Sequence, residues 1–167
     1  MTIKNNIILS HKEINHKIKR IAYQIYESNV DEKEVIIAGI ESNGYVFAKK
    51  LKIELKKISN IDPVLCKVII VKKNPLSDIK TSLAVDQYIK KTLVLVDDVL
   101  NSGTTLIYGV KHFLNVPLKQ FKTAVLVNRN HKKYPVKADF KGISLSTSLN
   151  EHVSVELKGK RLEVVLE

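Results

Sequence analysis

Cysteine and long apolar runs are what this sequence has least of. Cys66 is the only cysteine, so an intramolecular disulfide and a zinc site made of several thiolates are both excluded. No apolar run approaches the roughly 18 residues needed to span a bilayer. Residues 1–6 lack the apolar block of a secretory signal. These absences favour a cytoplasmic protein without a membrane partner.

The charge balance leaves two classes of partner open. The chain has 28 Lys and Arg residues against 17 Asp and Glu residues, a net charge of +11. Such a charge favours anionic partners, either phosphorylated metabolites or nucleic acid. The lysines are scattered through every segment, however, and an ordinary solvated surface would show the same distribution.

Short apolar runs alternate with amphipathic segments along most of the chain. The runs cover residues 35–40, 64–71, 93–96 and 123–127, and helical spacing covers residues 14–25, 46–58 and 106–114. Strands that alternate with helices pair in parallel through right-handed crossovers. The sequence therefore predicts an α/β fold with a central, mostly parallel sheet flanked by helices. Alternation over residues 153–157 and 162–166, with Gly159 between them, predicts a C-terminal β-hairpin.

The stretch LVLVDDVLNSGTT, residues 93–105, has the residue types of a ligand site. A buried strand places Asp97 and Asp98 at its carboxyl end, where ligands of open α/β sheets bind. The next loop opens a helix whose unpaired N–H groups attract an anion, and Gly103 lets the backbone approach it closely. A phosphate fits the loop, and the acids fit hydroxyl groups or a cation. A sugar phosphate with free hydroxyl groups meets both demands.

The same residue types can also form an Asx turn and a helix N-cap without any ligand. One Asp with one Ser would favour that interpretation. The longer pattern Asp-Asp-Val-x-x-Ser-Gly-x-Thr, after four aliphatic residues, favours a ligand site instead. The dinucleotide pattern G-x-G-x-x-G and the P-loop pattern G-x-x-x-x-G-K-[ST] do not occur in the sequence.

Residues 97–105 resemble the phosphoribosyl-pyrophosphate (PRPP) motif of the type I phosphoribosyltransferase family. The likeness extends over about residues 14–157. It is greatest to bifunctional pyrimidine-operon attenuation regulators that are also uracil phosphoribosyltransferases, through residues 38–44 and 124–140.

This resemblance implies the type I phosphoribosyltransferase fold in a single domain, residues 1–167. The core would occupy about residues 30–128. The N-terminal segment and residues 129–150 would form a small hood over it. Residues 72–86, which are polar and rich in turn-formers, would be a flap that closes over the substrate.

The resemblance also implies a role for each part of the site. Asp97 and Asp98 would be catalytic, binding the ribose hydroxyl groups and stabilising the positive charge that develops on the sugar. The 5′-phosphate would be bound by Asn101, Ser102, Gly103, Thr104 and Thr105. The pyrophosphate would lie against Ser42, Asn43 and Gly44. The base pocket would be formed by Asn128, Phe140 and Lys141. The cofactor Mg²⁺ would bind substrate oxygens, with no direct protein ligand.

Some of these segments depart from the pattern of the relatives. Ser42-Asn43-Gly44 stands where Thr-Arg-Gly is usual, and Asn128 replaces an acid. Lys72 or Lys73 on the flap could supply the missing cation, although a solvated lysine pair would have the same sequence. The resemblance further implies a cis, or switchable, peptide bond between Ser42 and Asn43.

Two functions follow from the resemblance. The first is an enzyme that transfers ribose 5-phosphate from PRPP to a nucleobase, with uracil or another pyrimidine as the expected base. The second is an RNA-binding regulator of pyrimidine genes that senses nucleotides with little or no catalysis, with Lys19, Lys132 and Lys137 as RNA contacts. The intact motif at residues 97–105 favours the enzyme. The resemblance also implies a homodimer or a larger homo-oligomer.

Overall fold

The central sheet is parallel except at one edge. The computed structural model describes residues 6–167. The sheet has the strand order β4-β3-β2-β5-β6-β7. Its strands are β2 (Glu34–Ile40), β3 (Asp62–Ile69), β4 (Lys80–Thr81), β5 (Thr92–Leu100), β6 (Gln120–Arg129) and β7 (Phe140–Leu145). Only the β3–β4 pairing in this sheet is antiparallel. The buried strand predicted at residues 93–96 is confirmed as part of β5, which lies between β2 and β6 in the interior of the sheet.

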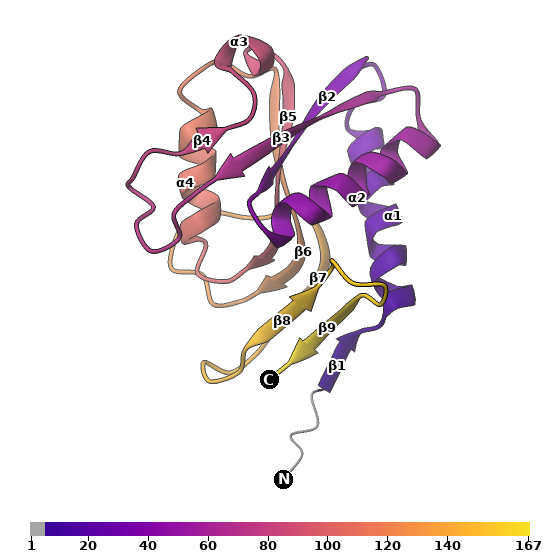
Figure 1. Cartoon of the computed structure of the whole chain (residues 1–167), viewed down its shortest axis with the longest axis vertical. Helices are drawn as coiled ribbons and strands as arrows, with labels where there is room; N and C mark the ends of the chain where they lie inside the picture. The colour runs from indigo at the N-terminus through magenta and orange to yellow at the C-terminus, as the bar shows by residue number, and fades with distance from the viewer. Residues whose placement is uncertain (1–5) are drawn as a thin grey trace.

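Helices cover both faces of this sheet (Figure 1). On one face lie α1 (His11–Glu27) and α2 (Asn43–Ile58), and on the other lie α4 (Thr104–Phe113) and the short α3 (Val85–Tyr88). Successive side chains of a strand point to opposite faces. Ile37 accordingly packs in the cluster beneath α1 and α2, whereas Ile36 packs in the cluster beneath α4. Burial on both faces explains the continuous apolar runs in the sequence.

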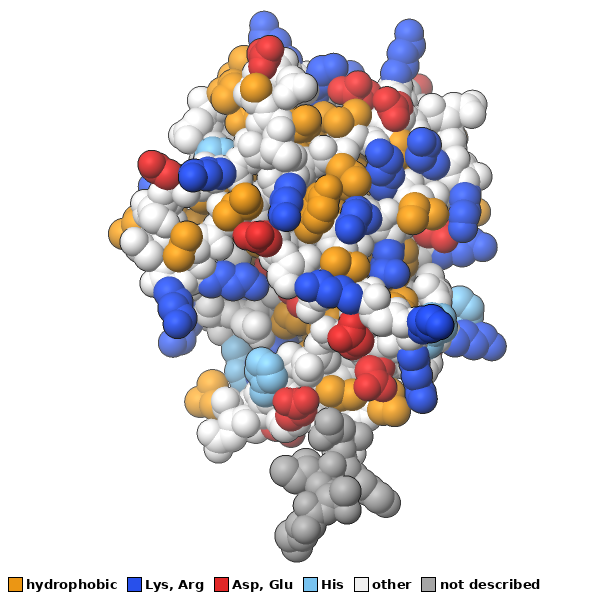
Figure 2. Space-filling view, in the orientation of Figure 1, with side chains coloured by type: hydrophobic (Ala, Val, Ile, Leu, Met, Phe, Trp, Pro, Cys, Tyr) orange, Lys and Arg blue, Asp and Glu red, His pale blue; other side chains and the backbone are white. Residues whose placement is uncertain are grey.

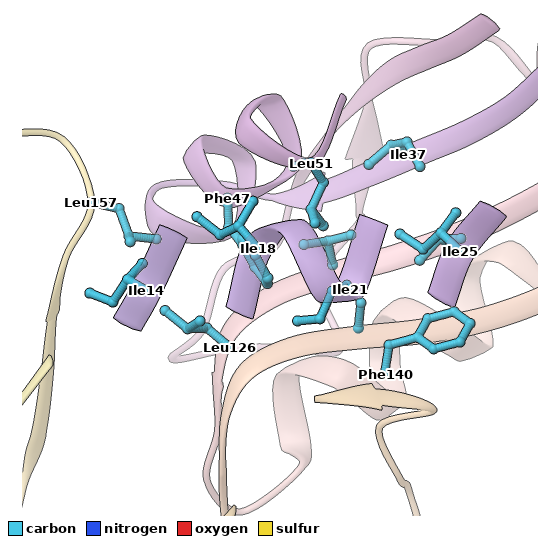
Figure 3. Packing of buried hydrophobic residues seen from close by; sticks show 14 of the residues in the cluster. Ile14, Ile18, Ile21, Ile25, Ile37, Phe47, Leu51, Leu126, Phe140 and Leu157 are labelled. Carbon is cyan, nitrogen blue, oxygen red and sulfur yellow. The ribbon is translucent and has the colours of Figure 1, made fainter. Parts of the chain in front are cut away.

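The first helix shows how the sequence builds this core. The Ser10 side chain accepts a hydrogen bond from the Glu13 backbone N–H, and the Glu13 carboxylate accepts one from the Ser10 N–H. This reciprocal capping box begins α1, as predicted. The buried stripe of α1 then packs between α2 and the sheet (Figure 3). It consists of Ile14, Ile18, Ile21, Ala22 and Ile25. Each fully buried isoleucine contributes about 1.5–3 kcal/mol of transfer free energy.

A second sheet joins the two ends of the chain. Its strands β1 (Asn6–Leu9), β9 (Glu163–Leu166) and β8 (Val153–Glu156) are antiparallel. In Figure 1 this sheet lies at the lower end of the molecule, beside the carboxyl ends of β5 and β6. The predicted C-terminal hairpin is confirmed as β8–β9. We call this three-stranded sheet the hood.

The composition of the hood differs from the expectation for residues 129–150. Within that segment, β7 is the edge strand of the core sheet and pairs in parallel with β6. The strands of the hood come instead from the N-terminal segment and residues 153–166. The expected flap also contains regular structure, because β4 and the start of α3 lie within residues 72–86. Of the helices in residues 6–167, none has the length and apolar character needed to cross a membrane.

Candidate active site

A pocket of about 380 Å³ lies where β5 ends and α4 begins. Five separate parts of the chain line it: the start of α2, the flap, the β5–α4 segment, β6, and β8 with the residue before it. The lining residues are Asn43, Lys72, Asp97, Asp98, Val99, Leu100, Asn101, Ser102, Gly103, Thr104, Thr105, Leu106, Val125, His152, Val153, Ser154 and Val155. The pocket therefore brings the two predicted acids and the predicted phosphate loop together under the hood.

The two acids differ in their surroundings. Asp97 is only 4% exposed, whereas Asp98 is partly exposed to the pocket. Burial raises the pKa of the Asp97 carboxyl well above its usual range, the charge of Asp98 raises it further, and Lys72 opposes both effects. Oδ1 of Asp97 accepts a hydrogen bond from the Asp98 N–H at 2.9 Å. Asp98 is therefore the acid whose side chain is better placed to contact a ligand.

The predicted phosphate loop leads into the N-terminus of α4. Gly103 is the N-cap residue and has a left-handed backbone with φ 86°, and no side chain caps the helix. Of the backbone N–H groups in the first turn, that of Thr104 donates to Ser102 Oγ at 3.3 Å. Thr104, Thr105 and Leu106 line the pocket, and the N-terminus of a helix attracts anions. Ser102 Oγ lies 2.8 Å from Thr104 Oγ1 in the same loop. The Ser102 carbonyl accepts hydrogen bonds from the backbone of Lys133 and Tyr134, which holds the loop against the β6–β7 segment.

The segment Ser42-Asn43-Gly44 lies beside β5, where Gly44 packs against Val96 and Asp97. Gly44 packs so closely that a Cβ atom there would lie 2.9 Å from Oδ1 of Asp97. Asn43 lines the pocket, and its Nδ2 donates a hydrogen bond to the Val155 carbonyl of the hood at 2.9 Å. The Ser42–Asn43 peptide is trans in this structure, so the expected cis bond is not found here. Ser42 instead has φ 75°, which is a strained conformation for a residue other than glycine.

The structure separates the two flap lysines. Lys72 lines the pocket, and its positive charge is felt by Asp97. Lys73 is exposed and is not among the lining residues. Of the two candidates for the missing cation, only Lys72 is in place.

Phe140 and Lys141, two of the three residues expected in the base pocket, do not line this pocket. Phe140 is 8% exposed and belongs to the core cluster, where Figure 3 shows it beside Ile25 of α1. Lys141 is exposed, and its carbonyl accepts a hydrogen bond from Arg20 of α1. The reason is register: β7 begins at Phe140, which pairs with Ala124, so both residues lie away from the carboxyl edge of the sheet.

Asn128 does lie at that edge, next to the site. It is buried at the end of β6 and pairs with Leu100, a residue that lines the pocket. Its Nδ2 donates to Ser144 Oγ at 3.3 Å, whereas its Oδ1 is buried without a hydrogen-bond partner among the described residues. A buried acceptor of this kind is stabilised when a ligand supplies a donor.

Sequence reasoning missed the wall opposite the acids. Residues 152–155 of the hood line the pocket, and His152 is exposed while Val153 is buried. Arg129 was also missed: it is 7% exposed, and its Nη1 donates to Oδ1 of Asn101 at 3.0 Å. The alternation of residues 153–157 predicted the strand, but nothing in the sequence indicated which element the strand would face.

The three expected RNA contacts come from two segments. Lys19 is exposed on α1, whereas Lys132 and Lys137 are exposed on the β6–β7 segment. That segment packs through Val136 and Ala138 against the cluster on the face opposite α1. In Figure 2, lysine and arginine side chains are spread over the visible face and do not form one continuous block.

Solved phosphoribosyltransferase structures have the same architecture. The hypoxanthine-guanine phosphoribosyltransferase of Bacillus anthracis superposes with a TM-score of 0.71 at 22% identity, over 87% of this chain and 85% of that chain. The hypoxanthine phosphoribosyltransferase of Trypanosoma cruzi gives 0.74 at 18% identity, over 96% and 95%. At these identities the likeness concerns the fold alone, and it confirms the predicted type I phosphoribosyltransferase fold.

Sequence comparison gives a finer result. Residues 4–159 match the phosphoribosyl transferase domain. The bifunctional protein PyrR of Fusobacterium nucleatum is 34% identical over an alignment of 178 positions, which covers 99% of this chain and 100% of that protein. The protein of the same name from Clostridium beijerinckii is 31% identical over 161 residues, 92% of this chain and 90% of that protein. The chain belongs to the phosphoribosyl transferase domain family, which confirms the assignment of this sequence to the phosphoribosyltransferases.

Proposed function

We propose that the protein transfers ribose 5-phosphate from PRPP to a pyrimidine base, with uracil as the first base to test. The observation that carries this proposal is the single pocket in which Asp97 and Asp98 adjoin the uncapped N-terminus of α4. A ligand that satisfies both must have an anionic group at one end and hydroxyl groups beside it. PRPP has a 5′-phosphate and two ribose hydroxyl groups in that relation.

The substrate would bind along the carboxyl edge of the sheet. The 5′-phosphate would lie on the backbone N–H groups of residues 102–105, with Asn101 at the rim. The ribose hydroxyl groups would donate to Asp98 and Asp97. The diphosphate at C1 would then extend toward Ser42, Asn43 and Gly44, where Lys72 supplies positive charge.

The base would lie between the hood and the end of β6. His152 and the residues up to Val155 provide the wall that faces the acids. The unpartnered Oδ1 of Asn128 would accept a hydrogen bond from a ring N–H of the base. Uracil keeps such a donor at N3 while N1 loses its proton and forms the bond to the sugar, and this is why uracil is the first base to test.

The two acids would act on the charge that develops during transfer. Departure of the diphosphate leaves positive charge on the sugar, which a carboxylate stabilises in the transition state. The Ser102–Thr105 amides hold the other end of the substrate still. Closure of the hood and the flap over the pocket would exclude water, which would otherwise hydrolyse the substrate.

Magnesium fits this site as an ion held mainly by the substrate. Residues 6–167 contain no group of three or more His, Cys, Asp or Glu side chains arranged to hold a metal ion. Mg²⁺ commonly uses one or two carboxylates together with substrate phosphates, and Asp98 is the partly exposed carboxylate in the pocket. When bound, the ion would neutralise negative charge on the leaving diphosphate.

The test is an assay of pyrophosphate release with a panel of nucleobases. We expect release with uracil, PRPP and Mg²⁺ together, accompanied by formation of uridine monophosphate. Omission of the base or of Mg²⁺ should abolish it. Release with hypoxanthine or guanine and not with uracil would refute the pyrimidine assignment. If no base supports release although uridine monophosphate binds, the enzyme proposal fails.

A surface hollow on α1 favours RNA binding as a second candidate function. Its lining is basic and aromatic, with His16, Lys19, Arg20 and Tyr23, and its volume is about 330 Å³. The net charge of +11 also favours binding of an anionic partner such as RNA. An RNA-binding protein should lose affinity steeply as salt rises, with log K falling linearly against log salt. Affinity that stays constant between low and high salt would count against this candidate.

A further inference from the structure

A second pocket, of about 520 Å³, lies on the other side of the Ser42 loop. Lys72 lines both pockets, so the two are neighbours at this residue. Ser42 and Tyr45 at the start of α2 form one side of the second pocket, and Lys158 from the turn between β8 and β9 forms another. Lys158 does not line the first pocket.

The charges of the second pocket favour an anion. Three lysines line it, Lys67, Lys72 and Lys158, against one acid, Glu41. Lys67 is paired with Glu41 at 3.8 Å. Neither Lys72 nor Lys158 forms an ion pair with an acid in the described part of the chain. Two lysines that form no ion pair among the described residues therefore flank the Ser42 loop, one from the flap and one from the hood.

The backbone holds Lys158 in this position. The Lys158 and Gly159 N–H groups donate to Oε1 of Glu156 at 2.6 and 3.0 Å, which fixes the turn. Nζ of Lys158 donates to Oγ of Ser42 at 3.5 Å. The next residue of the loop, Asn43, is also bonded to the hood, through the Val155 carbonyl. The side chains of two consecutive loop residues, Ser42 and Asn43, are thus each hydrogen-bonded to the β8–β9 hairpin.

We propose that Lys158 binds the diphosphate group of PRPP together with Lys72. This inference rests on the proposed function, because that function places the diphosphate at the Ser42 loop. The diphosphate would replace Ser42 Oγ as the partner of Nζ. In the contact with Ser42 Oγ only the ammonium is charged, whereas in an ammonium–phosphate contact both partners are charged, and this makes the second contact the stronger one. The hood would then take part in binding the leaving group as well as covering the pocket.

The test measures inorganic pyrophosphate and uridine monophosphate separately by calorimetry, with Mg²⁺ present. Lys158→Gln should weaken pyrophosphate binding by roughly tenfold, the loss of one charge-assisted contact. It should leave the affinity for uridine monophosphate unchanged, because that ligand has no diphosphate. Lys158→Arg should restore most of the pyrophosphate affinity. In the enzyme assay, KM for PRPP should rise in Lys158→Gln.

Lys160→Gln is the matched control, because it removes the same charge from the same exposed turn and does not line the pocket. Equal weakening by Lys158→Gln and Lys160→Gln would overturn the inference in favour of a general charge effect. Unchanged pyrophosphate affinity in Lys158→Gln would overturn it directly. A wild-type protein that binds neither pyrophosphate nor uridine monophosphate would overturn the proposed function, and the inference with it.

Discussion

Arg129 Nη1 donates a hydrogen bond to Oδ1 of Asn101 at 3.0 Å, and this contact joins the end of β6 to the phosphate loop. The same guanidinium donates to Thr147 Oγ1 and to the carbonyls of Ser148 and Glu151. Arg129 is 7% exposed, and all these acceptors are neutral. The buried Arg129 guanidinium is thus hydrogen-bonded both to the loop at Asn101 and to the segment that leads into β8, and it stabilises these two sides of the pocket together.

Replacing Arg129 with Lys should therefore weaken the hydrogen bonds both to the loop at Asn101 and to the segment that leads into β8. An ammonium group keeps the charge but cannot reach acceptors in several directions as the planar fork does. We expect a stability loss of about 2–4 kcal/mol, typical of a broken buried network, and a KM for PRPP raised about tenfold. Thermal unfolding and initial rates measure the two effects. Arg161→Lys, at an exposed site on the hairpin turn, is the control and should change neither.

Asp98→Asn should affect turnover more than binding. If Asp98 stabilises charge that exists only in the transition state, kcat falls about 100-fold while the affinity for uridine monophosphate stays within a few-fold. Asp31→Asn removes an exposed carboxylate beyond the opposite end of the sheet and should leave both unchanged. Equal losses in kcat and nucleotide affinity would mean that Asp98 acts only as a ribose contact in the ground state.

Asp97 should make the free protein less stable as pH rises. Its pKa is raised in the folded state above the ordinary value of 3.8, so the native state holds a proton that the unfolded state releases. Stability is therefore lost as pH rises from that value through the raised pKa. Asp97→Asn removes this loss. Its melting temperature should exceed that of the wild type near neutral pH, and the difference should shrink as the pH falls toward 3.8.

A gain of 1 kcal/mol corresponds to about 2–4 °C in a domain of this size, so the difference is measurable by thermal unfolding at a series of pH values. Asp31→Asn serves again as the control, because its carboxylate is exposed. A pH-independent difference between Asp97→Asn and the wild type would show that burial does not perturb this acid.

The sequence contained enough to predict the core and the turn that leads into α4, because both depend on local patterns. Four aliphatic residues before Asp97 predict a doubly buried strand, and the Ser-Gly-x-Thr pattern predicts the turn into α4. The base pocket depends on long-range register. Phe140 next to Lys141 was interpreted as a stacking residue, yet β7 pairs Phe140 with Ala124, well before the edge at Asn128.

The hood was harder to predict for the same reason. Its sheet forms only when β1 pairs with β9 across nearly the whole chain. The alternation of residues 153–157 indicated a half-buried strand but not its neighbour. Arg129 likewise gave no local signal, since its acceptors lie up to 28 residues away in the sequence, at Asn101.

Gly103 gives the sharpest test of the phosphate loop, because both its backbone and its surroundings exclude a side chain. Its φ of 86° is in the left-handed region, and a Cβ atom there would lie 2.7 Å from Cγ1 of Val136. Gly103→Ala should therefore cost about 1–2 kcal/mol of stability. It should also displace the N–H groups that meet the 5′-phosphate, which weakens uridine monophosphate binding at least tenfold. Gly159→Ala is the matched control: the nearest atom to its Cβ is 3.7 Å away and its backbone is not left-handed. Calorimetry with uridine monophosphate, below the melting temperature of each variant, separates the two effects. A folded Gly103→Ala protein that binds the nucleotide as tightly as Gly159→Ala would place the 5′-phosphate elsewhere in the pocket.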